Sequence, residues 1–146
     1  MSEIIITIAF IIVIYVFFFQ GKNKKPVNKI ILKENDQIIA DNVRCAYLTF
    51  QRMVGLLNTP SINKGEALII DPCKAIHMKF MGFSIDAVFI DKKGEIVAIY
   101  EDLEPQKKYR VFRPGNKAKA VIELPLSTVK KHELKLGQIL EFIYDE

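Results

Sequence analysis

The chain has 146 residues, half of them hydrophobic, so it is long enough to bury one core of ordinary size. Its formal net charge is +4, from 21 Lys and Arg residues against 17 Asp and Glu residues. This mild excess falls well short of the clustered basic surface that nucleic-acid-binding proteins carry, so no nucleic-acid partner is expected.

Residues 4–19 form an apolar run in which Thr7 is the one polar residue. As a helix this run would be about 24 Å long, short but sufficient against roughly 30 Å of hydrocarbon. A cleaved signal peptide is the alternative, but it requires a basic start and a small-residue cleavage site, and the run has neither. The sequence therefore predicts a transmembrane anchor over residues 1–20 and a single-pass membrane protein that contacts the membrane through residues 4–19.

The side of the membrane follows from the flanking charges. No Lys or Arg precedes the run, whereas four lysines follow it closely: Lys22, Lys24, Lys25 and Lys29. The positive-inside tendency then places the domain in the cytoplasm, with an extracytoplasmic domain as the alternative. Residues 21–28 are polar and are predicted to be a tether. The two cysteines, Cys45 and Cys73, fit either free thiols or one disulfide, and their spacing does not choose between them.

Residues 29–146 are predicted to form a single β-rich domain. Apolar, β-branched runs indicate strands over residues 30–33, 37–40, 43–46, 67–70, 85–90, 96–100, 118–124 and 138–144, and short helices are expected over 49–56 and 127–134. The clearest hairpin joins 85–90 to 96–100, with Gly94 supplying the positive φ of the turn. The fold class is mainly β, with α+β as an alternative. We expect a compact sandwich or barrel-like sheet of about six to eight short strands with two short helices, preceded by one transmembrane helix.

A thiol, an imidazole and a thioether recur at four-residue intervals in Cys73, His77 and Met81, a ligand set that favours copper or zinc. If residues 71–82 form a helix, capped by Asp71 and ended by Gly82, then Cys73 and His77 are neighbours that can share a metal ion or form a thiol–imidazole pair. If they form a strand, about 13 Å separates the two residues and neither arrangement is available. The sequence leaves both conformations open, and packing in the core is the plainer role for all three.

Two carboxylates fall within predicted strands. Asp86 shares a strand face with Val88 and Ile90, and Glu123 shares one with Val121, so both are expected to be buried. Because an unpaired buried carboxylate is costly, Asp86 should have a partner or cap the backbone, and the candidate partners are Arg52, Lys79 and His77. His132 is expected on a solvated helix face. Phosphate loops, nucleophile elbows and paired Cys-x-x-Cys motifs are absent from the sequence.

Several blocks, in the same order, resemble the domain of unknown function 192 family. They lie between residues 37 and 142: Gln51–Leu57, Gly65–Ile70, Pro72–Cys73, Ile76–His77, Met81, Ile85–Asp91, Gly94, Ala120–Leu124 and Leu136–Leu140. Small departures occur at Leu57, at Gly82–Ser84 and at Gln138. The resemblance implies a small β-rich fold, often behind an export signal or anchor, with no established activity. It also implies a second version of the motif that keeps the methionine and the aspartate but lacks the cysteine and the histidine.

The leading hypothesis is a membrane-tethered, non-enzymatic accessory domain that binds an unidentified protein or small molecule. Its groove is predicted to be lined by five residues: Arg52, His77, Met81, Asp86 and Glu123. One alternative is a metal-binding site or thiol-dependent enzyme built on Cys73 and His77. The other alternative is a purely structural scaffold at the membrane. The sequence does not indicate the oligomeric state.

Overall fold

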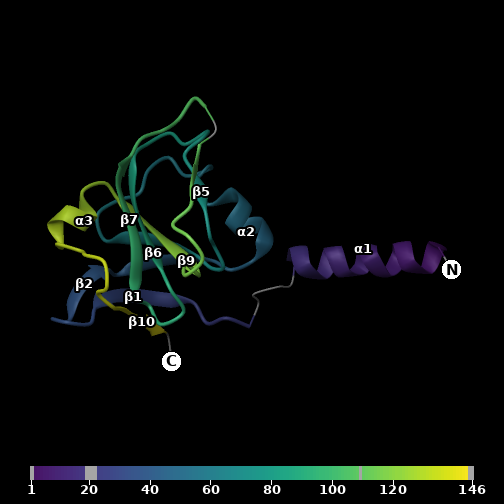
Figure 1. Cartoon of the computed structure of the whole chain (residues 1–146), viewed down its shortest axis with the longest axis horizontal. Coiled ribbons are helices and arrows are strands. Elements are labelled where there is room, and N and C mark those ends of the chain that lie inside the picture. Colours follow the sequence, from purple (N-terminus) through teal and green to yellow (C-terminus); the bar gives the residue numbers. More distant parts are fainter. Residues whose placement is uncertain (1, 19–22, 109, 145–146) are drawn as a thin grey trace.

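A computed structural model of the chain describes residues 2–18, 23–108 and 110–144. Over these residues three helices and ten strands are formed, and the strands make three sheets (Figure 1). The elements in chain order are α1 (Ser2–Phe18), β1 (Val27–Leu32), β2 (Gln37–Ala40), β3 (Asn42–Ala46), α2 (Thr49–Val54), β4 (Glu66–Ile70), β5 (Ile76–His77), β6 (Ile85–Ile90), β7 (Ile96–Leu103), β8 (Val111–Phe112), β9 (Ala120–Pro125), α3 (Thr128–Lys131) and β10 (Leu140–Tyr144).

The largest sheet has five strands in the order β3-β4-β9-β6-β7. Strands β3 and β4 are parallel, and the other neighbours are antiparallel. All six residues of β6 are buried, which requires that both faces of the sheet be covered at this strand. Its near-continuous apolar sequence, interrupted by Asp86, suits a strand with no solvent-exposed face.

Two hydrophobic cores cover the two faces of this sheet. On the first face, Val88, Ile122 and Leu124 pack with Ile30 and Leu140 of the three-stranded sheet β10-β1-β2. The second face packs against α2 and the irregular segment that surrounds β5, and its buried residues include Leu56, Ile70, Met78, Phe89 and Val121. Odd and even positions of β6 and β9 therefore belong to different cores, as the alternation of side chains along a strand requires.

The hairpin of β6 and β7 confirms the clearest prediction from the sequence. The two strands pair antiparallel, and Gly94 has a φ of 83° in the turn between them. One oxygen of the Asp91 carboxylate accepts hydrogen bonds from the backbone N–H groups of Lys93 at 2.7 Å and Glu95 at 3.0 Å. A side chain that replaces backbone partners in this way is typical of aspartate at the start of a turn.

The predicted sandwich or barrel-like sheet of six to eight strands is wrong. The structure is a mainly β α+β fold in which the three sheets are open and the helices are three in number over the described residues. The difference has a local cause at β5 and β8, two-residue strands that pair only with each other. They form a separate two-stranded sheet and do not extend the five-stranded sheet.

The predicted transmembrane anchor is also contradicted. Over the described residues, no helix combines the length and the apolar character that crossing a membrane requires. Helix α1 is described over 17 residues, Ser2–Phe18. The single-pass topology and the inferred side of the membrane lose their basis with it. Residues 1, 19 and 20 of the predicted anchor, and 21 and 22 of the tether, lie outside the described residues.

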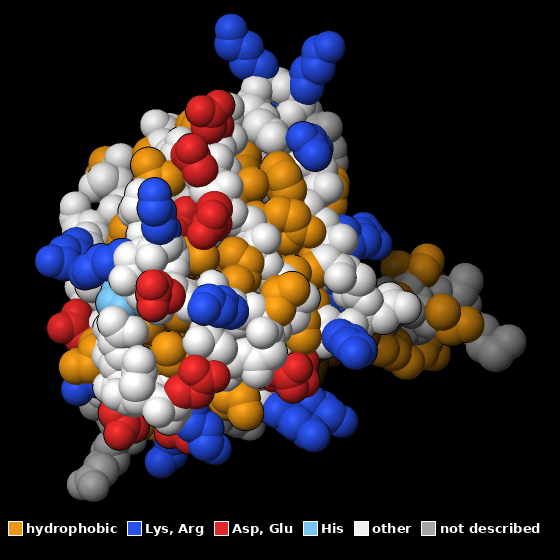
Figure 2. Space-filling model, turned by 60° about the vertical axis from the view of Figure 1, so that its left-hand side comes forward, with side chains coloured by type: hydrophobic (Ala, Val, Ile, Leu, Met, Phe, Trp, Pro, Cys, Tyr) orange, Lys and Arg blue, Asp and Glu red, His pale blue; other side chains and the backbone are white. Residues whose placement is uncertain are grey.

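Charged side chains of both signs are interspersed over the face shown in Figure 2. Apolar side chains appear between them, and the projecting helix carries apolar side chains. Residues 3–16 of α1 are all exposed. This helix meets the rest of the chain at α2, where the Thr49 hydroxyl donates a hydrogen bond of 2.9 Å to the backbone carbonyl of Val16.

Candidate functional site

A small cavity of about 100 Å³ lies between α2, the segment around β5 and the second face of the five-stranded sheet. Four of the five residues predicted to line a groove border it: Arg52, His77, Met81 and Glu123. Cys73 borders it as well, whereas Asp86 does not. The fold thus gathers side chains that are up to 71 positions apart in the chain, from Arg52 to Glu123.

The segment 71–82 forms neither the predicted helix nor a continuous strand. Only β5 is regular in it, and β5 pairs antiparallel with β8, so that His77 lies opposite Val111. Asp71, the expected helix cap, instead forms an ion pair of 2.9 Å with Lys24. Its carboxylate is thereby engaged by a residue far away in the chain, and the local capping signal has no effect.

Glu123 reaches the cavity from the middle of the sheet. It is 7% exposed, and it lies in register with Leu68 on β4 and Ala87 on β6. Its Oε2 atom is buried and has no hydrogen-bond partner among the described residues. Burial raises the pKa of this carboxyl group to about 7, while the positive charge of Arg44 opposes the shift. Arg44, on β3, lies opposite Leu68 on β4, and Leu68 lies opposite Glu123 on β9. Arg44 and Glu123 are therefore in the same row across the sheet.

Arg52 reaches the cavity from α2. Its Nη2 atom donates a hydrogen bond of 3.2 Å to the Thr49 hydroxyl. The Nη1 atom is buried and has no hydrogen-bond partner among the described residues. The helix itself begins at a side-chain cap, since Gln51 accepts hydrogen bonds from the backbone N–H groups of Leu48 at 3.1 Å and Tyr47 at 3.2 Å. A fixed helix end therefore holds one guanidinium edge toward the cavity.

Cys73 is a neutral thiol in this arrangement. Burial is the main reason that its pKa is raised, the charge of Glu123 adds to the shift, and the charge of Arg52 opposes it. The Sγ atom donates a hydrogen bond of 3.2 Å to the backbone carbonyl of Ala75. Since the thiolate is the form that attacks electrophiles and binds metals, this environment disfavours both kinds of chemistry.

The candidate metal ligands Cys73, His77 and Met81 all border the cavity. However, nowhere in the described part of the chain do three or more His, Cys, Asp or Glu residues form a group that could hold a metal ion. A copper or zinc site would thus depend on one thiol, one imidazole and one thioether, and metal binding there stays a prediction. Cys45 packs against the first core, so it is remote from this set, and both cysteines are free.

Asp86 lies on the opposite face of the sheet from the cavity. Strand register explains this, because Asp86 pairs with Leu124, whereas Ala87 pairs with Glu123. Asp86 is 1% exposed, and its two carboxylate oxygens accept hydrogen bonds from the backbone N–H groups of Asp102 at 3.0 Å and Val129 at 2.9 Å. It caps the backbone of two distant segments, one of them at the start of α3.

Sequence reasoning missed Arg44 and Thr49 because neither carries a motif. Arg44 influences the pKa of Glu123 only through the pairing of β3, β4 and β9. The Thr49 hydroxyl accepts a hydrogen bond from Arg52 and donates one to the backbone carbonyl of Val16. Alternation along β3 could have indicated that Arg44 and Ala46 share a face.

The fold and the cavity define a small, mainly β domain with buried polar groups on one face of its central sheet. Residues 30–142 match the family model DUF192, described as uncharacterized ACR. The UPF0127 protein of Thermococcus sibiricus is 30% identical over 122 residues, which cover 80% of this chain and 76% of that protein. A UPF0127 protein of Thermococcus kodakarensis is 26% identical over 105 residues, 68% of this chain and 64% of that protein. The chain belongs to the DUF192 family, and the resemblance predicted from its motifs is confirmed.

Two crystal structures share the fold. A protein of Sinorhizobium meliloti matches with a TM-score of 0.64 and 23% identity, covering 82% of this chain and 94% of that one. A protein of unknown function from Novosphingobium aromaticivorans matches with a TM-score of 0.67 and 16% identity, covering 80% and 83%. At such identities the likeness extends to the fold alone.

Proposed function

We propose that this domain binds a ligand or partner by taking a small neutral polar group, of the carboxamide type, into the cavity between α2 and β5. One observation carries the proposal: Arg52 Nη1 and Glu123 Oε2 are both buried, both lack a hydrogen-bond partner among the described residues, and both residues line one cavity. Leaving a buried polar group unpaired costs about 1–3 kcal/mol, so two such groups in one place favour an occupant that satisfies them.

The chemistry of the two groups selects the occupant. Arg52 is a permanent donor, and Glu123, with a pKa of about 7, is an acceptor whenever it is ionised. A carboxamide offers a carbonyl oxygen to the first and an N–H to the second. A carboxylate would be repelled by the negative charge of Glu123, and an ammonium group would be repelled by the positive charge of Arg52.

The size of the cavity limits what enters it. A volume of about 100 Å³ is below the range of roughly 300–1,000 Å³ that whole small-molecule ligands occupy. The occupant is therefore one end of a ligand or one side chain of a partner, such as the amide of Asn or Gln. The proposal is of a binding domain and assigns no reaction, in keeping with the neutral state of the Cys73 thiol.

Titration of the full chain with acetamide, followed by backbone amide NMR shifts, tests this function. We expect saturable shifts at Gly55 and Ile76, which line the cavity. The shifts should be lost in Arg52→Met and in Glu123→Met, which keep the bulk of the side chain and remove the polar end. Arg113→Met, at an exposed arginine outside the cavity, is the matched control and should respond as the natural chain does. Equal shifts with acetate, or unchanged acetamide binding in Arg52→Met, would overturn the proposal.

A further inference from the structure

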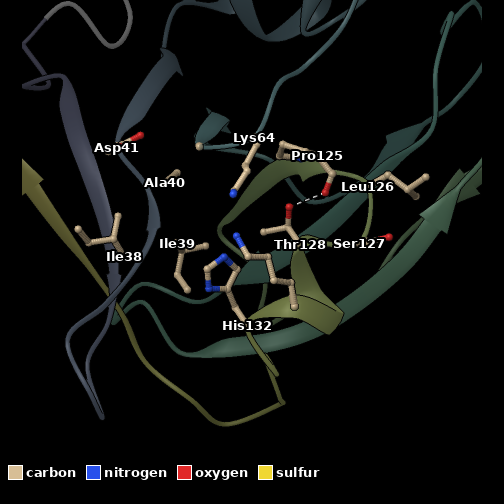
Figure 3. A pocket seen from close by; sticks show the side chains of 12 residues that line it. Ile38, Ile39, Ala40, Asp41, Lys64, Pro125, Leu126, Ser127, Thr128 and His132 are labelled. Atoms are coloured by element: carbon tan, nitrogen blue, oxygen red, sulfur yellow. Dashed lines mark hydrogen bonds between the residues drawn. The ribbon is translucent and has the colours of Figure 1, made fainter.

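A second and larger cavity, of about 390 Å³ (Figure 3), lies near β2 and α3, away from α2 and β5 (Figure 1). It is bordered by β2, by the turn that holds Lys64 and by the end of β9 with α3. Its volume falls in the range of roughly 300–1,000 Å³ that whole small ligands occupy. None of the residues of the α2–β5 cavity borders it.

Positive charge gathers at one end of this cavity. Figure 3 shows the side chains of Lys64 and His132 extending toward the same space from different elements, and Lys131 lines the cavity beside them. In the described part of the chain neither lysine forms an ion pair. Asp41 is the one acidic residue among those that line the cavity. Two ammonium groups and an imidazole thus face an unfilled volume with one carboxylate nearby.

Burial and the positive charges around this cavity lower the pKa of His132. Burial is the larger cause, and the charges are those of Lys131 and Lys64. Its Nδ1 atom is buried and has no hydrogen-bond partner among the described residues. The imidazole also borders a second hollow, whose charged residues are of both signs: Glu34, Lys130, Lys131, Glu133 and Lys135. An anion placed between the two lysines would offset their effect and give a protonated imidazole its partner.

The rest of the wall is mainly apolar, with Asp41, Ser127 and Thr128 as its other polar residues. Ile38 and Leu126 line the cavity and are 47% and 48% exposed, and Ile39 forms its buried side. The one hydroxyl fixed in the wall, that of Thr128, already donates a hydrogen bond of 2.6 Å to the Pro125 carbonyl, drawn as the dashed line in Figure 3. The cavity therefore combines a cationic end with an aliphatic surface and offers little else for polar recognition.

We propose that this second cavity binds an organic anion with a short apolar body, its charged head between Lys64, Lys131 and His132 and its apolar body against Ile38, Ile39 and Leu126. A medium-chain carboxylate has this chemistry. The site is separate from the α2–β5 cavity, because the two share no residue, although β9 borders both, through Pro125 here and through Glu123 there.

The chain has two histidines, so a proton NMR titration of the imidazole signals reads the site directly. With hexanoate added to the full chain, we expect the pKa of His132 to rise; the variant His77→Gln assigns the two imidazole signals. Hexanol, which has the apolar body without the charge, and acetate, which has the charge with a minimal body, should each bind far more weakly. Lys64→Met should weaken hexanoate binding by about fivefold, the effect of removing one partly solvated charge.

Lys64 is exposed, so its substitution should leave the fold intact. Lys117→Met, at another exposed lysine that borders a different surface hollow, is the matched control and should bind hexanoate unchanged. A His132 pKa that ignores hexanoate would overturn the proposal. Equal affinity of Lys64→Met and of the natural chain for hexanoate would also overturn it. Binding of acetate as tight as that of hexanoate would refute the role of the aliphatic wall.

Discussion

Asp86 and Glu123 lie on hydrogen-bonded neighbouring strands, yet their carboxylates face opposite sides of the sheet. The register sets Asp86 beside Leu124 and Ala87 beside Glu123. The first carboxylate is fully engaged by two backbone N–H groups, whereas Oε2 of the second has no partner among the described residues. Asp86 therefore stabilises the fold. Glu123 lowers the stability of the fold through its unpaired buried oxygen, and a role in binding would explain why it is present.

Glu123 should make the free energy of unfolding depend on pH. Its folded pKa of about 7 exceeds the ordinary value of 4.5, so the folded chain holds this proton more tightly than the unfolded chain does. The stabilisation is fully present below the unfolded pKa and is lost as the pH rises through the folded pKa. Between about pH 4.5 and 7 the loss amounts to roughly 3 kcal/mol.

Urea denaturation of the natural chain and of Glu123→Gln, at pH 4 and at pH 8, measures this effect. The variant mimics the protonated acid at every pH, so its advantage should appear at pH 8 and vanish at pH 4. Glu101→Gln, at an exposed glutamate, is the control and should follow the natural chain. A pH-independent difference between the natural chain and Glu123→Gln would show that burial does not shift this pKa.

Replacing Asp86 should destabilise the domain without affecting the α2–β5 cavity, which Asp86 does not border. Asp86→Ala leaves the N–H groups of Asp102 and Val129 without their partner, a loss of about 3 kcal/mol or more, since each bond to a charged acceptor is worth roughly 1.5–3 kcal/mol. Asp86→Asn keeps one acceptor oxygen and should lose less. Chemical denaturation gives both values. If acetamide binding is abolished in a variant that is still folded, Asp86 has a role beyond the one assigned to it.

Gly94 and Gly137 form a matched pair for separating backbone strain from steric clash. Their φ angles are 83° and 86°, so alanine at either position is strained to a similar degree. A Cβ atom at Gly94 would lie 2.5 Å from the backbone oxygen of Leu140, whereas one at Gly137 meets nothing within 4 Å. Gly137→Ala should cost about 1 kcal/mol and Gly94→Ala at least about twice that, measured by thermal or urea denaturation. Equal costs would mean that β10 shifts freely.

The Cys73 thiol should react slowly in the folded chain. In a Cys45→Ala variant it is the one remaining thiol, and its raised pKa lowers the thiolate fraction at neutral pH. Alkylation by iodoacetamide should be slower in the folded chain than in urea, because less of the thiol is ionised in the folded chain. A folded-state rate above that in urea would revive the hypothesis of a thiol-dependent enzyme.

Local signals in the sequence predicted the local parts of this fold. The hairpins of β1 with β2 and of β6 with β7 form where turn residues separate apolar runs, and Gly94 has the expected conformation. The parallel pairing of β3 with β4 has no such signal, because it depends on contacts between segments far apart in the chain. Side-chain alternation within β6 and β9 was readable, but the register that sends Asp86 and Glu123 to opposite faces was not.

The segment 71–82 shows how local cues fail when tertiary contacts compete with them. Asp71, Pro72 and Gly82 would suit a helix, but Asp71 is paired with Lys24, and β5 pairs with β8. His132 was expected in solvent, and it lines a cavity because Lys64 arrives from a turn 68 positions earlier in the chain. The grouping of Arg52 with Glu123 likewise depends on how α2 packs against the sheet.

Strand β1 has β10, the last strand of the described residues, as one of its two neighbours, with Leu32 opposite Leu140 and Ile30 opposite Phe142. During synthesis, β1 can pair with β2 soon after both leave the ribosome, but its other edge must wait for more than a hundred further residues. Ile30 and Leu32 stay incompletely buried throughout that interval. The nascent domain therefore carries an open strand edge until β10 has been synthesised, and in that period it is most exposed to aggregation and to chaperone capture.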